Sequence, residues 1–285
     1  MHIGFDISQT GSQKAGCGYY ADALIKAMMT VAPQNRYSLF PSFGDFFFDA
    51  QMPILTPYRG AQVHYGPRHL TRESARNFWN DAELEKAIGQ LDIVHCNNFW
   101  APIQISSSRV IYTIYDLGFA ANADWTTEAN RVGCFDGAFR SSVGADWAIA
   151  ISENSRRHYL NVFPHFPGDR VRVVYPCSRF TDLTRQGSPP AGMKDHRSDE
   201  FWLSVGTIEP RKNQRLLAKA YARYLDAGGR PMPLVFAGGR GWMMEDFQDY
   251  LAELGILNHV ELPGYVTDDE MIWLYRNCRF FNDQR

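Results

Sequence analysis

Residues 201–213 read FWLSVGTIEPRKN, a pattern that indicates a strand, a loop and the start of a helix. Its apolar start is typical of a buried strand that ends at Gly206. A short loop then delivers Arg211 and Lys212 to the start of a helix, where backbone N–H groups favour anions. Two fixed cations at such a place suit a diphosphate, whose oxygens arginine binds in bidentate fashion. A plain turn between strand and helix, with solvated cations, is the alternative that this pattern leaves open.

The rest of the chain alternates short apolar runs with amphipathic segments, which is typical of an α/β fold with parallel sheets. Strands are expected at residues 2–6, 61–65, 92–95, 110–114, 147–151, 171–174, 201–205, 233–237, 259–262 and 279–281. Helices are expected at residues 19–31, 127–143, 212–227, 243–255 and 268–277, with another that starts near residue 153. Segment 186–192 is rich in Gly, Pro and Ser, as surface linkers are. We therefore expect a first domain over residues 1–180, a linker over 181–199 and a second domain over 200–285.

The composition limits the function classes. The formal net charge of -2 over 285 residues argues against a protein with a dominant nucleic-acid-binding surface. The five cysteines are scattered without metal-binding spacing, which favours reduced thiols in a cytoplasmic protein. No apolar stretch approaches the roughly 20 residues that span a bilayer, so any membrane contact is expected to be peripheral, on the inner face of the cytoplasmic membrane. The aromatic stretch 43–48 suggests either contact with a lipid-linked acceptor or, as the favoured alternative, a buried cluster.

Residues 205–213 closely resemble the donor-diphosphate loop of the family 4 (group 1) glycosyltransferases. Residues 234–242 (LVFAGGRGW), residues 260–266 (VELPGYV) and the pair Leu274-Tyr275 follow in the order and spacing of that family. The resemblance extends over nearly the whole chain and implies a GT-B fold, in which two Rossmann-like domains face a cleft. It also implies a retaining enzyme that transfers a sugar from a nucleoside diphosphate sugar to a hydroxyl acceptor.

The resemblance also implies a range of substrates. Family members build polysaccharides, lipopolysaccharide cores and glycolipids, so the expected partners are a nucleotide-sugar donor and a glycan or glycolipid acceptor. Mannose is the suggested sugar because many relatives use it. The family neutralises the leaving diphosphate with protein cations, so the resemblance implies neither a metal nor a cofactor beyond the donor substrate.

Particular residues receive roles from the same resemblance. The expected catalytic residues are Asp116, Arg211 and Lys212, of which the two cations neutralise the charge that develops on the leaving diphosphate. The expected donor-binding residues include glycines that let the backbone approach a ligand closely, together with neighbours of the phosphates and the base. They are Gly16, Gly18, Gly206, Thr207, Arg211, Lys212, Gly239, Tyr265 and Val266.

Position 115 departs from the family pattern. The family usually carries histidine directly before the aspartate that corresponds to Asp116, whereas this chain has Tyr115. A phenol can hydrogen-bond a hydroxyl but cannot replace a histidine that titrates near neutrality. Asp116 itself matches, although capping of a helix or loop is an alternative role. For Ser152 and the acidic run 268–270, capping and dipole compensation at helix starts are the favoured roles.

The second domain is expected to be incomplete. After the strand expected at 279–281, the family carries a Gly-rich loop between two glutamates, and the chain stops before that motif. Two further hypotheses therefore stand beside the transferase. The chain would be a truncated, catalytically inactive nucleotide-binding remnant, or another GT-B-like enzyme such as a sugar-nucleotide epimerase. A remnant would bind a nucleoside diphosphate without releasing diphosphate from any donor, and an epimerase would need no acceptor.

Overall fold

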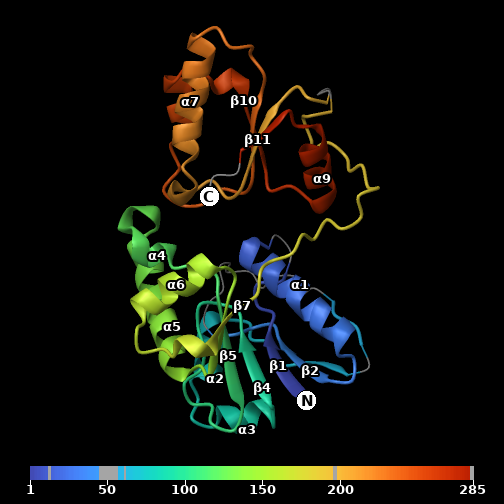
Figure 1. Cartoon of the computed structure of the whole chain (residues 1–285), viewed down its shortest axis with the longest axis vertical. Helices are drawn as coiled ribbons and strands as arrows, with labels where there is room; N and C mark the ends of the chain where they lie inside the picture. The colour runs from blue at the N-terminus through green and yellow to red at the C-terminus, as the bar shows by residue number, and fades with distance from the viewer. Residues whose placement is uncertain (12–13, 45–56, 61, 195–197, 283–285) are drawn as a thin grey trace. The chain divides into compact units, whose positions relative to one another are not determined.

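The chain forms two compact units, which Figure 1 shows in a computed structural model that describes residues 1–11, 14–44, 57–60, 62–194 and 198–282. Unit 1 comprises Met1–Ala121 and Ala129–Arg179, and unit 2 comprises Asn122–Glu128 and Phe180–Arg285. The predicted end of the first domain, at residue 180, lies one residue from this division. Residues 122–128 differ from the prediction because they group with unit 2. There the Trp242 indole nitrogen donates to the Trp125 carbonyl oxygen at 3.0 Å.

Unit 1 is built on a parallel sheet of seven strands in the order β3-β2-β1-β4-β5-β6-β7. Its strands are β1 (His2–Asp6), β2 (Arg36–Phe40), β3 (Val63–Tyr65), β4 (Ile93–Cys96), β5 (Arg109–Ile114), β6 (Trp147–Ala150) and β7 (Val171–Val173). Its helices are α1 (Gly16–Val31), α2 (Arg72–Trp79), α3 (Leu84–Ile88), α4 (Gly118–Ala121), α5 (Glu128–Gly144) and α6 (Glu153–Val162). The strand order reverses between β1 and β4, and ligands of such sheets bind at the carboxyl ends of the strands beside that reversal.

Apolar side chains form a separate layer on each face of this sheet. On one face, α1 packs Ile25 into a cluster with Phe5 of β1. On the other face, α2, α5 and α6 contribute Trp79, Ala138 and Tyr159 to a larger cluster. Helices on both faces of an all-parallel sheet are the expected architecture, because each strand then buries both of its faces.

The first residue of the aromatic stretch 43–48 is buried in this larger cluster. Phe43 is 1% exposed, and its ring centroid lies 4.0 Å from that of Trp79. For Phe43 the buried alternative is therefore correct. Residues 45–48 lie outside the described residues.

Unit 2 has a parallel sheet of four strands in the order β10-β9-β8-β11. Its strands are β8 (Trp202–Val205), β9 (Leu234–Ala237), β10 (Val260–Gly264) and β11 (Phe280–Asn282). Its α-helices are α7 (Gln214–Asp226), α8 (Phe247–Glu253) and α9 (Asp268–Asn277), with a 3-10 turn at Pro210–Lys212 before α7. One apolar cluster lies under α7 and α8 and another under α9, so this sheet also has both faces covered. Both units thus have the parallel α/β architecture that the sequence predicts.

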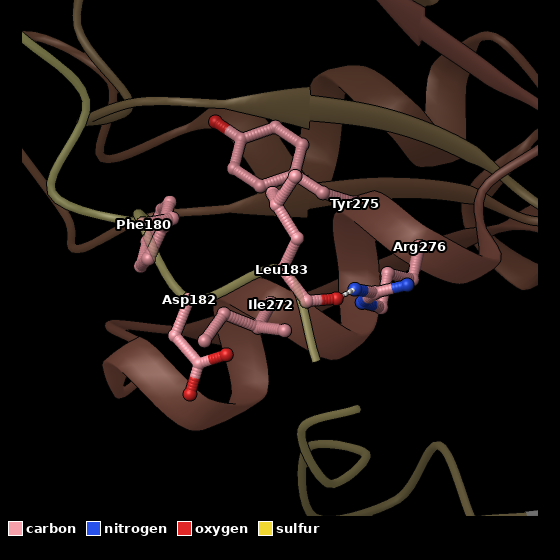
Figure 2. Close-up of a pocket in the computed structure, with 6 residues that line it drawn as sticks. All are labelled: Phe180, Asp182, Leu183, Ile272, Tyr275 and Arg276. Carbon is pink, nitrogen blue, oxygen red and sulfur yellow. Dashed lines mark hydrogen bonds between the residues drawn. The ribbon is translucent and has the colours of Figure 1, made fainter. Parts of the chain in front are cut away.

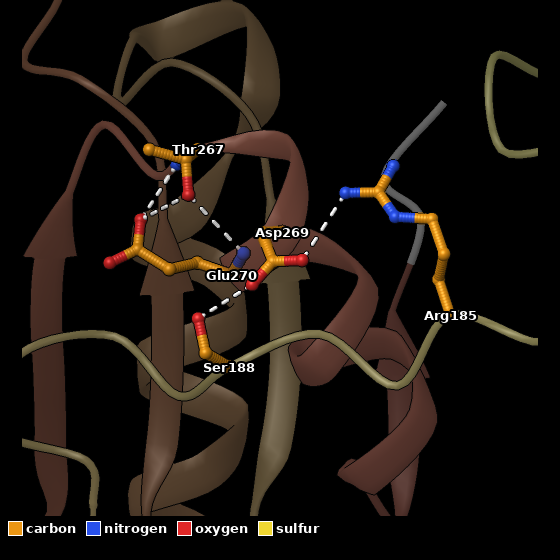
Figure 3. A network of polar contacts seen from close by, with 5 residues as sticks. All are labelled: Arg185, Ser188, Thr267, Asp269 and Glu270. Atoms are coloured by element: carbon orange, nitrogen blue, oxygen red, sulfur yellow. Dashed lines mark hydrogen bonds and ion pairs between the residues drawn. The ribbon is translucent and has the colours of Figure 1, made fainter.

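The predicted linker is largely part of unit 2. Residues 180–193, here called the strap, lie against α9, where Ser188 Oγ donates to Asp269 Oδ2 at 2.7 Å and Arg185 pairs with the same carboxylate at 3.2 Å (Figure 3). Gly187 has φ +73°, and a Cβ there would lie 2.5 Å from the Trp273 backbone nitrogen. Met193 is buried in the cluster under α9. This part of the linker prediction was wrong, because hydrogen bonds and apolar contacts fix the strap to the helix.

The acidic run at the start of α9 serves that helix. Thr267 Oγ1 accepts from the Glu270 backbone nitrogen at 3.3 Å, and Glu270 Oε2 accepts from the Thr267 backbone nitrogen at 2.7 Å (Figure 3). This reciprocal pair is a capping box. The predicted role of residues 268–270 at a helix start is confirmed.

Candidate functional site

Three loops of unit 2 meet at the carboxyl ends of β8, β9 and β10. The Gly206 nitrogen donates to the Ala237 carbonyl at 3.0 Å, and the Gly238 nitrogen donates to the Gly264 carbonyl at 2.9 Å. Two residues further along the first two loops, the Ile208 nitrogen donates to the Gly239 carbonyl oxygen at 3.0 Å. Backbone hydrogen bonds therefore hold the three loops in one layer, at the edge where parallel sheets bind ligands.

The glycines of these loops differ in whether the fold requires glycine at their positions. Gly206 has φ +145°, a conformation that other residues rarely adopt. A Cβ on Gly238 would lie 2.5 Å from the Gly206 carbonyl carbon and closer still to its oxygen. A Cβ on Gly239 would meet nothing within 4 Å. Folding thus requires Gly206 and Gly238, whereas Gly239 leaves open backbone that a ligand can approach.

Arg211 and Lys212 lie one turn before the helix at which the sequence places them. They end the 3-10 turn Pro210–Lys212, Asn213 follows in the left-handed region at φ +53°, and α7 begins only at Gln214. The prediction of a helix from residue 212 was wrong, because the left-handed Asn213 interrupts the helical backbone. The two cations are held by the loop itself.

The two cations have different surroundings. The Arg211 guanidinium pairs with Glu209 Oε1 at 2.7 Å, and the Glu209 side chain is only 4% exposed. The Lys212 side chain lies along Gly206, with its Cε 3.6 Å from the position that a Cβ there would take. A buried carboxylate therefore orients Arg211, and Lys212 lies directly over the glycine turn. Glu209 is not predicted from the sequence, where its only signal is its position two residues before an arginine.

Gln214 is a second residue of the site that the sequence does not predict. Its Nε2 donates to the Thr207 carbonyl oxygen at 2.9 Å and so fixes the loop to the first turn of α7. Its Oε1 is buried and accepts no hydrogen bond from the residues that the structure describes. Thr207 therefore contributes its backbone to the loop geometry, as part of the layer that holds Lys212.

The two predicted base contacts differ in exposure. Tyr265 follows β10 and is 42% exposed, so its ring is accessible to a ligand. Val266 is buried and belongs to the apolar cluster under α9. A base contact through the Val266 side chain is excluded in this conformation, because that side chain packs in the core.

A pocket of about 460 Å³ lies elsewhere in unit 2, between the strap and α9 (Figure 2). Arg276 closes one side by donating to the Leu183 carbonyl oxygen. None of the sequence-predicted site residues lines this pocket. Its lining residues are Phe180, Asp182, Leu183, Ile272, Tyr275 and Arg276.

The predicted site residues of unit 1 lie near the start of α1 and the end of β5. A Cβ on Gly18 would lie 3.1 Å from the Gln9 carbonyl carbon and closer still to its oxygen, whereas one on Gly16 would meet nothing within 4 Å. Gly18 is therefore needed for packing, and Gly16 is the open position. The exposed Asp116 accepts from the Gly118 nitrogen at 2.8 Å, which is the capping role left open by the sequence.

Tyr115 is a buried structural side chain. Its hydroxyl donates to the Cys17 carbonyl oxygen at 3.2 Å, and Ser155 Oγ donates to the Tyr115 carbonyl oxygen at 2.7 Å. Burial raises the pKa of the Tyr115 phenol well above its usual value. Ser152 accepts from the Ser155 nitrogen at 3.0 Å and so caps α6 as predicted. Tyr115 thus connects β5 to the start of α1.

A buried polar network lies at the reversal of strand order in unit 1, and the sequence analysis missed it. Asp6 Oδ1 accepts from the Ser8 Oγ at 2.6 Å, and Asp6 Oδ2 accepts from the Asn97 nitrogen at 3.0 Å. Thr113 Oγ1 donates to Asn97 Oδ1 at 2.8 Å, so the contact of His95 Nε2 with Thr113 at 2.9 Å is a donation from the ring. The network joins the ends of β1, β4 and β5.

Burial shifts the two titrating groups of this network in opposite directions. Desolvation raises the pKa of Asp6 to about 6, although hydrogen bonds from Ser8 and Asn97 oppose the shift. Desolvation lowers the pKa of His95 to about 4. Asp6 therefore raises the free energy of unfolding at pH values below its ordinary pKa. This contribution is lost as the pH rises through about 6. His95 raises the free energy of unfolding at pH values above its ordinary pKa. This contribution is lost as the pH falls through about 4.

The variant His95→Gln tests this assignment. We expect the wild type to lose about 3 kcal/mol of unfolding free energy relative to the variant as pH falls from about 6.5 to about 4, because only the wild type carries the depressed histidine. Urea unfolding of both proteins at each pH measures this difference, in which the contribution of Asp6 cancels. A difference that stays constant with pH would contradict a neutral, buried His95.

Comparison with protein families decides the identity of unit 2. Residues 194–282 match the family model for glycosyl transferases group 1. Residues 194–282 therefore belong to this family. The match includes every strand of the unit 2 sheet and the loops that carry Gly206, Lys212 and Gly239. The resemblance to group 1 glycosyltransferases that the sequence predicts is thus confirmed.

Two curated relatives of this chain come from Escherichia coli. O-antigen chain mannosyltransferase B is 27% identical over 194 residues, which cover 66% of this chain and 50% of the relative. Serotype-specific mannosyltransferase WbdA is 24% identical over an alignment of 316 residues, which covers 99% of this chain and 37% of the relative. The chain thus spans half or less of the length of these two relatives.

A solved structure is similar to this chain in its fold. Anabaena HepE, crystallised in complex with UDP and glucose, matches with a TM-score of 0.60 at 16% identity. The match covers 99% of this chain and 73% of HepE. At this identity the likeness concerns the fold alone, and it confirms the predicted GT-B type.

In the described part of the chain, no helix is long and apolar enough to cross a membrane, and no group of three or more His, Cys, Asp or Glu side chains is placed to hold a metal.

Proposed function

We propose that this chain is a retaining glycosyltransferase that moves a sugar from a nucleoside diphosphate sugar to a hydroxyl acceptor in polysaccharide or lipopolysaccharide synthesis. The observation that carries the proposal is the loop 206–213. It places Lys212 over a glycine turn and holds Arg211 on a buried carboxylate, beside the open backbone of Gly239. Two cations and accessible backbone N–H groups suit the diphosphate of such a donor.

The chemistry of the proposed reaction needs stabilisation of the leaving group above all. Negative charge develops on the diphosphate as the bond to the sugar breaks, and Lys212 and Arg211 would neutralise it. Retention would follow front-side displacement, in which the leaving phosphate helps to deprotonate the acceptor hydroxyl. No enzyme nucleophile is then needed, in contrast to retaining glycosidases with two carboxylates. Asp116, at the end of β5, is the proposed catalytic contact from unit 1.

The names of the relatives supply the finer substrate proposals. Both E. coli relatives are mannosyltransferases, which supports mannose as the transferred sugar. We propose a glycan or glycolipid as the acceptor and a cytoplasmic location with peripheral contact at the inner face of the membrane. The proposal requires no metal, no further cofactor and no nucleic-acid partner.

A transfer assay tests this function. The purified chain is incubated with GDP-mannose, or with other sugar nucleotides, in the presence and absence of a glycan acceptor, and release of nucleoside diphosphate is followed. Acceptor-dependent release with an elongated product supports the transferase. Binding of nucleoside diphosphate in calorimetry without any release supports the inactive remnant instead. Conversion of the sugar nucleotide without an acceptor would point to an epimerase.

The variant Tyr115→Phe tests whether the Tyr115 hydroxyl contributes to stability alone or also to the transfer reaction. Loss of the hydrogen bond to the Cys17 carbonyl is expected to lower the unfolding free energy by about 1 kcal/mol. Transfer should continue at the wild-type rate, because the phenol is buried and already bonded within unit 1. Urea unfolding and initial rates measure the two effects. A variant that keeps its stability and loses transfer would show that this phenol takes part in the reaction.

A further inference from the structure

Helix α5 of unit 1, labelled in Figure 1, presents large apolar side chains to solvent. Four of them recur at spacings of three and four residues and are between 43% and 64% exposed. They are called the α5 stripe here: Val132, Phe135, Phe139 and Val143. The buried residues of the same helix are small: Gly137, Ala138, Ser141 and Ser142. This is the reverse of the usual amphipathic helix, whose large apolar side chains face the core.

Close packing explains the small inner residues of α5 but not the α5 stripe. A Cβ on Gly137 would lie 3.1 Å from the Phe99 carbonyl carbon, and one on Gly144 would lie 3.1 Å from the Ile103 Cα. The helix therefore packs directly on the backbone of the segment after β4, and only small residues fit between them. Ile103 is itself 51% exposed, so the apolar surface continues past the C-terminal end of α5. A continuous apolar surface of this kind indicates an interaction site.

The two phenylalanine rings of the α5 stripe are held in place by neighbours within unit 1. The ring centroids of Phe135 and Phe139 lie 5.9 and 6.4 Å from that of Phe163, which follows α6. The Phe139 ring also lies 6.3 Å from the His165 ring. Side chains that are already ordered lose little rotamer freedom when a partner covers them. The α5 stripe is therefore a preorganised surface for binding.

Asp136 lies among the residues of the α5 stripe and indicates the kind of partner. It is exposed and forms no hydrogen bond or ion pair with the residues that the structure describes. Arg140 follows one turn later on the same side of the helix and donates to Asn80 Oδ1 at 3.2 Å. A carboxylate in the middle of an apolar stripe opposes entry into lipid, because its desolvation there is costly. A protein partner with a cation at the matching place offsets that cost.

The order of these residues along α5 is self-complementary. A two-fold axis between positions 137 and 138 would pair two copies of the helix in antiparallel orientation. Val132 of one copy would then lie opposite Val143 of the other. Asp136 of one copy would lie within one residue, about 1.5 Å along the helix axis, of Arg140 of the other. The same axis creates this Asp–Arg pair twice, so each of the two carboxylates meets a cation.

We propose that the α5 stripe is the interface of a homodimer in which two copies of α5 pack antiparallel. The apolar side chains supply the buried surface, and the two pairs of Asp136 with Arg140 fix the register. A helix of 17 residues is only about 25 Å long. Its face is smaller than a standard interface, so we expect a dissociation constant on the order of 10 µM. The dimer goes beyond the proposed function, since its formation needs neither donor nor acceptor.

Sedimentation velocity of the purified chain, without any sugar nucleotide, tests the inference. Over concentrations from about 1 to about 100 µM we expect a monomer that converts to a dimer. The double variant Val132→Ser/Val143→Ser should dimerise about tenfold more weakly, because it removes apolar area from both ends of the stripe. Its matched control is Leu216→Ser, which removes a 59% exposed leucine from α7 of unit 2 and should dimerise like the wild type. A wild type that stays monomeric throughout would overturn the inference.

Two charge reversals test the pairing itself. Asp136→Arg and Arg140→Asp should each stay monomeric up to about 100 µM, because each brings like charges together across the axis. An equimolar mixture of the two variants should form a heterodimer, since every charge then meets its opposite. Circular dichroism checks that both variants are folded, because Arg140→Asp also loses the hydrogen bond to Asn80.

Three outcomes contradict this interface. A mixture that stays monomeric while the wild type dimerises would overturn the antiparallel pairing, and so would dimers formed equally by all variants. A monomeric wild type that binds phospholipid vesicles through the α5 stripe would assign this surface to a membrane and would overturn the dimer as well. Because no donor is present in these experiments, the transfer assay decides the proposed activity separately.

Discussion

Replacing Gly238 by alanine is expected to destabilise unit 2 by about 3 kcal/mol. The new Cβ would lie 2.5 Å from the Gly206 carbonyl carbon and 3.1 Å from the Thr207 nitrogen. Both are backbone atoms, so no flexible side chain can move aside. The loops after β8 and β9 must separate, which breaks the hydrogen bond from Gly206 to Ala237 and opens the layer around Lys212. Nucleoside diphosphate binding should be lost together with the stability.

Gly239→Ala is the matched control for this prediction. It adds the same methyl group one residue later, where nothing lies within 4 Å. Its stability should equal that of the wild type. Hydrogen exchange of peptides from β8, β9 and β10 measures the stability of unit 2 directly, even if the two units unfold separately. Equal protection in both alanine variants would contradict the close approach of the two loops.

Replacing Lys212 by methionine is expected to lower kcat/KM for the sugar-nucleotide donor about 100-fold. Methionine keeps an unbranched side chain over Gly206, so the loop should retain its structure while the charge that we propose to face the diphosphate is lost. The corresponding change at Arg211 is less informative, because it also breaks the ion pair between Arg211 and the buried Glu209 carboxylate. Initial rates over a range of donor concentrations give the measurement.

Lys219→Met supplies the control for lost charge. Lys219 is an exposed lysine on α7 outside the loop 206–213, and its removal should leave kcat/KM unchanged. The affinity of Lys212→Met for nucleoside diphosphate, measured by calorimetry, should fall as well. If Lys212→Met and Lys219→Met had the same activity, the loop could not be the site that neutralises the leaving group.

The sequence predicted elements whose signals are local. The range 268–277 predicted for α9 agrees with the structure, because Thr267 and Glu270 form a capping box that marks its start. The prediction missed β2 (Arg36–Phe40), where an exposed arginine and a serine interrupt the apolar pattern. It also missed α2 and α3. They are eight and five residues long, too short for a helical period to stand out.

In the candidate site, too, the sequence predicted the features that depend on residues close in sequence. Gly206, Arg211 and Lys212 are close in sequence, and the strand-to-loop pattern was enough to bring them together. The sequence could not distinguish Gly238 from Gly239, because their different roles depend on a contact between distant parts of the chain. Only Gly238 lies against the Gly206 carbonyl, and the sequence does not show that contact. The polar network of unit 1 is the extreme case. Asp6, Asn97 and Thr113 meet only because the strand order sets β1, β4 and β5 side by side.

The pairing of Arg211 with Glu209 has a kinetic consequence. Loop 206–213 contains one acidic and two basic residues, so its net charge is only +1. A single net charge in a chain of overall charge -2 exerts little attraction on an approaching anion beyond the Debye length. The rate of ligand capture should then vary little with ionic strength. Discrimination between anions would occur at contact distance, in how long a correctly shaped diphosphate stays bound.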